Sequence, residues 1–253
     1  MSGSLAIPQN FDAPHDAVSL STLEVERSGV AIPAQIWRPH GTPRALVLAL
    51  HGGSGHKQSD AILAIAAAFV RKDCAVLAID GPVHGERRID RDLSSGTART
   101  AFRDAWRAGV GRTEIAEDFR TALDRALGQD EYRDLPVGYI GVSMGTAYGI
   151  PLLAREPRIC AAAIGLWSTT YAASEHLAQY ARDITCPVWF TQQWNDEFFD
   201  REGTSALFDA VGSPDKRLVA YPGPHRELEG ARLDDAVDFL VKRLLAKPEE
   251  SAR

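Results

Sequence analysis

From about residue 45 to residue 245, short apolar runs alternate with helical patterns. This alternation predicts an α/β protein, with a mostly parallel central sheet and helices on both of its faces. In such sheets, functional residues gather at the carboxyl ends of the strands. The apolar runs lie at 46–50, 75–79, 137–140, 160–166, 187–191 and 217–221, and the helical patterns near 58–71, 113–127, 144–155, 202–211 and 230–246.

One strand-to-helix junction has the sequence Gly-Val-Ser-Met-Gly, at residues 141–145. It follows the apolar stretch 135–140, and a helical pattern over 146–155 stops before Pro157. Glycine at both ends removes Cβ atoms that would clash with the neighbouring strand and helix, so the turn can be very tight. Such a turn presents the Ser143 hydroxyl at the top of the sheet, at the positive end of the next helix. The pattern therefore indicates a nucleophilic serine, and the alternative is an ordinary glycine-rich turn.

A serine hydroxyl is a good nucleophile only when a base takes its proton and an acid orients that base. Both residue types follow later in the chain. The run 187–191 leads into a polar loop that contains Asp196, and the run 217–221 breaks at Pro-Gly-Pro, directly before His225. Ser143, Asp196 and His225 thus each follow a predicted strand, in that order along the chain.

Two more loops place glycines after a buried strand. His-Gly-Gly-Ser-Gly at 51–55 follows the run 46–50, and Asp-Gly-Pro-Val-His-Gly-Glu-Arg at 80–87 follows the run 75–79. Together with the Gly-x-Ser-x-Gly turn and the order serine, acid, histidine, these loops resemble the α/β-hydrolase superfamily over nearly the whole chain. The second loop is similar to that of small esterases and dienelactone-hydrolase-like members. True dienelactone hydrolases use a cysteine nucleophile, whereas this chain has Ser143.

The resemblance implies a hydrolase of carboxylic esters. Ser143 attacks the carbonyl carbon, His225 accepts and later returns the proton, and Asp196 fixes the imidazole tautomer. The backbone N–H groups of Gly53 and Met144 hold the oxyanion. The same machinery serves thioesters, lactones, amides and acyl transfer, and the fold also occurs in proteins that only bind a small molecule.

The acid and the base have competitors. Glu197 and Asp200 lie in the same loop as Asp196. Counted from Pro187, Asp196 falls where the superfamily's acid usually lies. His225 is either the base or a solvated surface histidine, and its place after Pro-Gly-Pro and before the terminal helix favours the base.

The least regular region is 88–112, which we expect to be a lid over the pocket, because the stretch 168–184 is too short for the usual cap domain. Phe102 and Trp106 are four residues apart, so on a helix they share one face, which either packs on the core or lines the pocket. Arginines near this region alternate with aspartates, which favours a solvated, salt-bridged face over an anion site. They are Arg87, Arg88, Arg91, Arg99, Arg103 and Arg107, interleaved with Asp90, Asp92 and Asp104.

Four residues near the strand ends are predicted to line the pocket. Trp167 and Trp194 follow two of the apolar runs, although most tryptophans are simply core. Ser54 lies in the expected oxyanion loop, and His84 lies near the mouth of the site, either as pocket wall or in structural hydrogen bonds. His51 is expected to hold the oxyanion loop in place.

The ends of the chain complete the predicted organisation. Residues 1–17 are expected to be irregular. Residues 20–27 alternate and residues 30–37 are expected to be extended, with Ser-Gly between them, and this pattern predicts an antiparallel hairpin. A single domain is expected over 18–247, followed by a tail at 248–253.

The net charge of −6 and the pI near 5.7 argue against binding to nucleic acid or to anionic lipid. Cys74, Cys160 and Cys186 are an odd number without a pairing pattern, which favours reduced, buried thiols and the cytoplasm. The N-terminus does not resemble a signal peptide, and no segment is apolar enough to span a membrane. Without zinc-type spacing or a phosphate loop, we expect no metal and no cofactor. The expected partner is a small-molecule ester, and nothing in the sequence specifies an oligomeric state.

Overall fold

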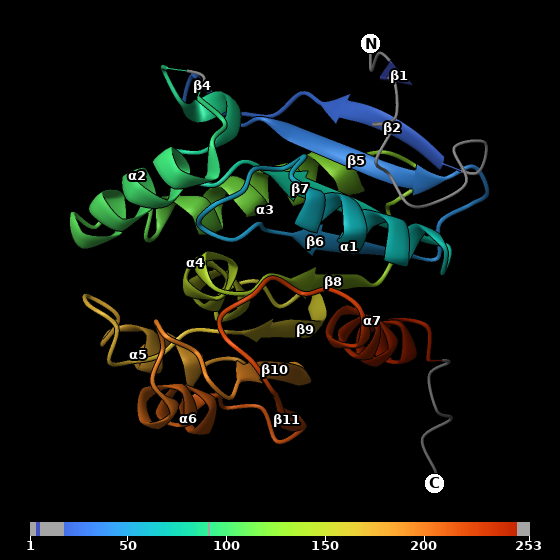
Figure 1. The fold of residues 1–253 in the computed structure, drawn as a ribbon. Coiled ribbons are helices and arrows are strands. Elements are labelled where there is room, and N and C mark those ends of the chain that lie inside the picture. Colours follow the sequence, from blue (N-terminus) through green and yellow to red (C-terminus); the bar gives the residue numbers. More distant parts are fainter. Residues whose placement is uncertain (1–3, 6–17, 91, 247–253) are drawn as a thin grey trace, which may run out of the picture.

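The computed structural model describes residues 4–5, 18–90 and 92–246, and a nine-stranded sheet dominates this part of the chain (Figure 1). The strands lie in the order β1-β2-β5-β7-β6-β8-β9-β10-β11. Their bounds are β1 Ser4–Leu5, β2 Val18–Leu23, β5 Ala34–Pro39, β6 Ala45–Ala49, β7 Cys74–Ile79, β8 Val137–Ile140, β9 Ile159–Gly165, β10 Val188–Gln193 and β11 Lys216–Tyr221.

The strands from β7 across to β11 run parallel, and β5, β2 and β1 add antiparallel strands at one edge. This confirms the predicted mostly parallel sheet with an antiparallel N-terminal part. The strand order reverses at β6, because β7 pairs on one side of it and β8 on the other. Ligands bind at such switch points in open α/β sheets, and Ser143 lies just past β8.

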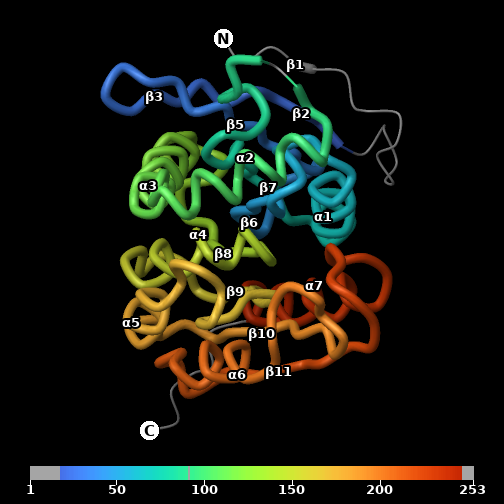
Figure 2. Tube along the Cα trace, turned by 60° about the vertical axis from the view of Figure 1, so that its left-hand side comes forward, coloured from blue at the N-terminus to red at the C-terminus, as the bar shows by residue number. Residues whose placement is uncertain are grey.

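Helices cover both faces of the sheet, as predicted. α1 and α7 pack on one face, and α3, α4, α5 and α6 pack on the other, in one apolar cluster with residues of α2 (Figures 1 and 2). Side chains of β6 alternate between the two clusters, since Leu46 and Leu48 join one and Val47 and Ala49 the other. The helices are α1 Asp60–Val70, α2 Ser95–Arg107, α3 Glu114–Leu127, α4 Met144–Leu153, α5 Leu177–Ala181, α6 Arg201–Ala210 and α7 Ala231–Leu244, with a 3₁₀ turn at Gly85–Arg87.

The predicted N-terminal hairpin is present. β2 pairs with β5, and β3 (Glu26–Arg27) pairs with β4 (Val30–Ala31) at the tip in the same register. Ser28 and Gly29 form the turn at φ of 53° and 78°. Two successive residues with positive φ are typical of the type I′ turns that fit the twist of a hairpin.

Three expectations change. Ser4–Leu5, in the segment expected to be irregular, pairs with β2, whereas residues 6–17 and the expected tail at 248–253 lie outside the described residues. Most of the described part of the expected lid is the regular helix α2. Cys160 is exposed rather than buried, because it is the extra residue where the β8–β9 register shifts, and the extra residue of a bulge is left out of the ladder.

Candidate active site

Ser143 occupies a strained turn between β8 and α4. Its φ and ψ are 57° and −121°, a backbone conformation that residues other than glycine rarely adopt. The flanking glycines allow this turn. A Cβ at Gly145 would lie 2.7 Å from the carbonyl oxygen of Leu50, and one at Gly141 would lie 2.8 Å from the hydroxyl of Tyr139. The turn is therefore too tight for side chains at either glycine.

Two buried side chains brace this turn. The Thr146 hydroxyl oxygen lies 3.0 and 2.5 Å from the carbonyl oxygens of Gly141 and Gly165, between which its single proton is shared, and it accepts the Gly165 N–H at 2.7 Å. The Tyr139 hydroxyl donates to the Gly145 carbonyl oxygen at 2.6 Å. These bonds link the start of α4 to the ends of β8 and β9, so the strained serine is held by its surroundings.

The structure brings Ser143, Asp196 and His225 together. His225 Nε2 lies 3.2 Å from the Ser143 hydroxyl, and Nδ1 lies 2.8 Å from a carboxylate oxygen of Asp196. Because a carboxylate can only accept, Nδ1 carries the proton in a neutral imidazole, and Nε2 is left to accept from the serine. The backbone N–H groups of Phe198 and Phe199 donate to the other Asp196 oxygen, at 2.9 and 3.0 Å, and fix its orientation.

The two competing carboxylates have other partners. Glu197 accepts the backbone N–H of His225 at 2.8 Å, so it contacts the loop of the histidine but not its ring. Asp200 caps α6 by accepting the Gly203 N–H at 2.7 Å, and it also accepts the Thr170 hydroxyl. These bonds to its oxygens lower the pKa of Asp200.

His51 sets the direction of one expected oxyanion donor. Its Nε2 accepts the Gly81 N–H at 2.9 Å, so its Nδ1 carries the proton and donates to the Gly52 carbonyl oxygen at 2.7 Å. That carbonyl belongs to the same peptide unit as the N–H of Gly53, so both are fixed together. Burial holds the pKa of His51 well below its usual value, which keeps the ring neutral.

Gly53 and Met144 present their N–H groups near the serine turn. No hydrogen bond among the described residues uses either group. Met144 is the first residue of α4, where backbone N–H groups lack an intrahelical partner. A Cβ at Gly53 would lie 2.7 Å from the Phe102 ring, so this loop also requires glycine.

His84 is not a pocket residue, which corrects one prediction. It is fully buried, its Nδ1 lies 2.6 Å from the Pro82 carbonyl oxygen, and its Nε2 lies 3.1 Å from that of Gly53. Of the two alternatives, the structure favours the structural hydrogen bonds. Burial also lowers the pKa of His84.

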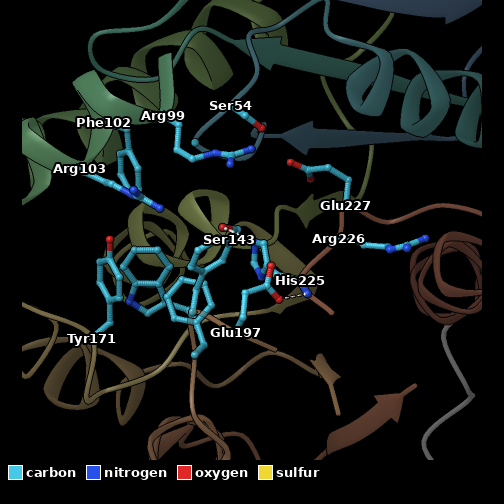
Figure 3. A pocket seen from close by; sticks show the side chains of 14 residues that line it. Ser54, Arg99, Phe102, Arg103, Ser143, Tyr171, Glu197, His225, Arg226 and Glu227 are labelled. Carbon is cyan, nitrogen blue, oxygen red and sulfur yellow. Dashed lines mark hydrogen bonds between the residues drawn. The ribbon is translucent and has the colours of Figure 1, made fainter. Parts of the chain in front are cut away.

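A cavity of about 270 Å³ opens over Ser143 and His225 (Figure 3). Ser54 and Trp167 line it, as predicted. Its wall is rich in aromatic rings, and Trp167 packs on Phe199 at 4.7 Å between ring centroids. The full lining is Gly53, Ser54, Arg99, Phe102, Arg103, Ser143, Trp167, Tyr171, Glu197, Phe198, Phe199, His225, Arg226 and Glu227.

Two predicted pocket tryptophans lie elsewhere. Trp106 is completely buried behind Trp167, with ring centroids 5.3 Å apart, and donates its indole N–H to the Ala172 carbonyl oxygen. Trp194 is half exposed on the surface, where the Arg201 guanidinium stacks on its ring. On α2, Phe102 reaches the cavity and Trp106 does not, because they lie one turn apart along the axis.

The arginines near α2 divide into two groups. Arg88 and Arg107 pair with Asp90 and Asp104, as the interleaved sequence predicts, whereas Arg87 pairs with Asp118 of α3. Arg99 and Arg103 instead line the cavity, which the charge pattern did not indicate. Arg91 lies outside the described residues.

Comparisons with known proteins agree with this geometry. A cold-adapted esterase from an Arctic intertidal metagenomic library has a solved structure with 33% sequence identity and a TM-score of 0.80, covering 90% of this chain and 95% of its own. The chain belongs to the α/β-hydrolase superfamily. A monoacylglycerol lipase of Mycolicibacterium smegmatis is 23% identical over 284 residues, covering 85% of this chain and 95% of the lipase.

One more distant structure shows how widely this fold is shared. A dienelactone hydrolase from Anabaena variabilis has a TM-score of 0.62 at 16% identity, with 96% of both chains covered. At that identity, the likeness extends to the fold alone. No family model matches the sequence.

Several lining residues of this α/β hydrolase were missed by the sequence analysis. Phe198 and Phe199 lie two and three residues after Asp196, and two adjacent apolar residues in a polar loop at a carboxyl strand end are a usable signal. Tyr171 lies in the short segment after β9, and Glu227 lies two residues beyond His225. Nothing in the sequence distinguishes these two from surface residues.

The described residues contain no group of three His, Cys, Asp or Glu side chains that could hold a metal ion. Among them, no helix combines the length and the apolar character needed to cross a membrane.

Proposed function

We propose that this protein hydrolyses carboxylic esters through an acyl-enzyme on Ser143. The observation that carries the proposal is the position of His225, with one ring nitrogen 3.2 Å from the serine hydroxyl and the other 2.8 Å from Asp196. The protein is a carboxylic ester hydrolase, and its esterase and lipase relatives support this class.

In the first half of the reaction, the Ser143 oxygen attacks the ester carbonyl carbon while His225 Nε2 takes the hydroxyl proton. Asp196 stabilises the imidazolium that forms, because it already holds the opposite ring nitrogen. The negative charge moves to the carbonyl oxygen, where the N–H groups of Gly53 and Met144 receive it. When the tetrahedral intermediate collapses, His225 gives the proton to the leaving alcohol oxygen.

In the second half, water replaces the alcohol. His225 takes a proton from the water, whose oxygen attacks the acyl carbon, and collapse of this second intermediate returns the proton to Ser143. The acid leaves and the free enzyme is restored. No step needs a metal or an organic cofactor, since the residues named supply the nucleophile, the base and the oxyanion donors.

The proposal also concerns the setting of the enzyme. We expect one domain over residues 18–247, with the 88–112 segment roofing the pocket. A small-molecule ester fits a cavity of about 270 Å³. The free state of Cys74, Cys160 and Cys186 supports a reducing compartment such as the cytoplasm.

Labelling with a fluorophosphonate tests the proposal. The reagent should add covalently to Ser143, as peptide mass spectrometry would reveal, and should abolish hydrolysis of p-nitrophenyl butanoate. Ser143→Ala should prevent labelling and lower kcat by roughly four or more orders of magnitude. Retention of a tenth of the wild-type activity by this variant would contradict the proposal.

A further inference from the structure

We infer that the pocket has two chemically different halves, and that its substrates are esters of an apolar acid with a hydroxylated alcohol that carries no negative charge. Glu227 and Arg99 form the polar half, which binds a hydroxyl group of the alcohol. This inference rests on the proposed function, since it assigns the two sides of the same ester.

The position of His225 decides which half takes the alcohol. A general acid must lie within hydrogen-bond reach of the oxygen that it protonates. The leaving oxygen of the ester therefore faces His225 Nε2, and the alcohol chain extends along the side of the cavity next to this histidine. The acyl chain occupies the other side.

Glu227 lies on the histidine side without a partner of its own. Among the described residues, its carboxyl group accepts no hydrogen bond and forms no ion pair. It packs against the oxyanion loop, since a Cβ at Gly52 would lie 2.2 Å from one of its oxygens. Burial raises the pKa of Glu227, and the nearby charges of His225 and Arg99 oppose this shift. The side chain is half-buried, and a carboxyl group partly withdrawn from water gains from a hydrogen-bond donor in the cavity.

Arg99 faces Glu227 across the cavity. The two side chains point toward one another in Figure 3, and both line the cavity. Since a guanidinium donates and a carboxylate accepts, a hydroxyl group between them can satisfy both at once.

The opposite half of the cavity is lined mainly by aromatic rings. Phe102, Trp167, Tyr171 and Phe199 form a continuous wall, in which neighbouring ring centroids lie between 4.7 and 6.1 Å apart. In Figure 3, Phe102 and Tyr171 lie across the cavity from Glu227. Arg103 lies beside Phe102 in Figure 3, and the rings supply the apolar surface that suits an acyl chain.

The charges on the histidine side select against an anionic alcohol. Glu197 and Glu227 line this side of the cavity and repel a negative charge. A hydroxyl group avoids this penalty and provides both a donor and an acceptor.

Four esters of butanoic acid test this inference. They carry ethyl, 2-hydroxyethyl, choline and carboxymethyl alcohol groups, and kcat/KM is measured for each by pH-stat. The wild-type enzyme should prefer the 2-hydroxyethyl ester over the ethyl ester by about tenfold, as expected for one added hydrogen bond to a charged group. The carboxymethyl ester should react more slowly than the 2-hydroxyethyl ester, because Glu197 and Glu227 repel its charge. The choline ester should react at least as fast as the ethyl ester, because the same carboxylates attract its charge.

Glu227→Met removes the carboxyl group and keeps an unbranched side chain. The ratio of the 2-hydroxyethyl to the ethyl ester should then fall to near one. Glu229→Met is the matched control, because Glu229 is exposed, pairs with Arg232 and does not line the cavity. This control should keep the wild-type ratio. Because each ratio compares two substrates in one preparation, a partly unfolded sample does not affect it.

A wild-type ratio near one, or an unchanged ratio in Glu227→Met, overturns the inference. If Glu227→Met does not fold, the ratio measured for the wild-type enzyme decides the outcome by itself. Failure of the proposed function looks different, because Ser143 would then resist the fluorophosphonate and none of the four esters would be cleaved.

Discussion

Ser143 combines chemical reactivity with backbone strain. Its φ of 57° and ψ of −121° cost roughly 1–3 kcal/mol for a residue with a side chain. The bonds of Thr146 and Tyr139 hold this conformation in place. The packing of the turn thus offsets the strain and keeps the Ser143 hydroxyl at the edge of the sheet.

This strain predicts different stabilities for two inactive variants. Glycine adopts the conformation of Ser143 freely, whereas alanine does not. The free energy of unfolding of Ser143→Gly should therefore exceed that of Ser143→Ala by about 1 kcal/mol, despite the entropy that glycine gains on unfolding. Urea denaturation of the two variants measures this difference, and a less stable glycine variant would show that the turn is relaxed.

The acid assignment is tested by removing one charge at a time. Asp196→Asn should lower kcat by roughly 10⁴, because asparagine stabilises the wrong tautomer of His225. Glu197→Gln and Asp200→Asn should cost far less, since neither carboxylate touches the imidazole ring. Activities are compared at equal concentrations of folded protein, measured by absorbance and circular dichroism. A larger loss in either control variant would reassign the acid.

At the scale of the element, α2 faces two environments. Phe102 reaches the cavity, and Trp106, one turn further along, is buried against Tyr148 and Trp167. The helix is thus pocket wall and core packing at once. Because the buried Trp106 anchors α2, this segment is not a loose loop over the site.

Trp106→Ala should therefore destabilise the protein without changing its specificity. Loss of a buried tryptophan costs about 3–5 kcal/mol, whereas Arg107→Ala, at the exposed next position, should stay within about 0.5 kcal/mol of the wild type. Thermal unfolding measures both effects. The relative kcat/KM values for short and long acyl esters should not change in Trp106→Ala, and a clear change would return this residue to the pocket.

At the scale of the whole molecule, buried histidines link stability to pH. Burial lowers the pKa values of His51 and His84, so these rings stay neutral in the folded protein at pH values where the unfolded chain binds protons. The contribution of these two histidines to the free energy of unfolding is fully present above the pKa of about 6.5 that histidine has in the unfolded chain. This contribution decreases as the pH falls below that value.

The free energy of unfolding should thus fall between pH 7 and pH 5.5. A histidine that remains neutral contributes at most ~1.4 kcal/mol per pH unit below its unfolded pKa. His51→Gln removes one such group, so its stability should depend less steeply on pH than that of the wild type. His40→Gln is a control at an exposed position. Equal slopes for His51→Gln and the wild type would mean that His51 is protonated in the folded state.

The sequence by itself determined the order of strands and helices and the positions of the three residues that meet at the site. Alternating apolar runs define where strands lie, and the glycines of 141–145 define where the chain must turn tightly. Because parallel strands end at one edge, the sequence alone predicts that Ser143, Asp196 and His225 lie near one another. These are local or topological properties, so they can be read along the chain.

Only the tertiary structure decided what surrounds those residues. Periodicity places Phe102 and Trp106 on one helix face, but the depth at which α2 crosses its neighbours decides which ring meets the cavity. Tertiary packing likewise decides that Trp194 lies on the surface, away from the cavity, and that Glu227 lines the cavity. A side chain's environment depends on segments far away in the sequence, and the pattern of one segment contains no information about the others that pack against it.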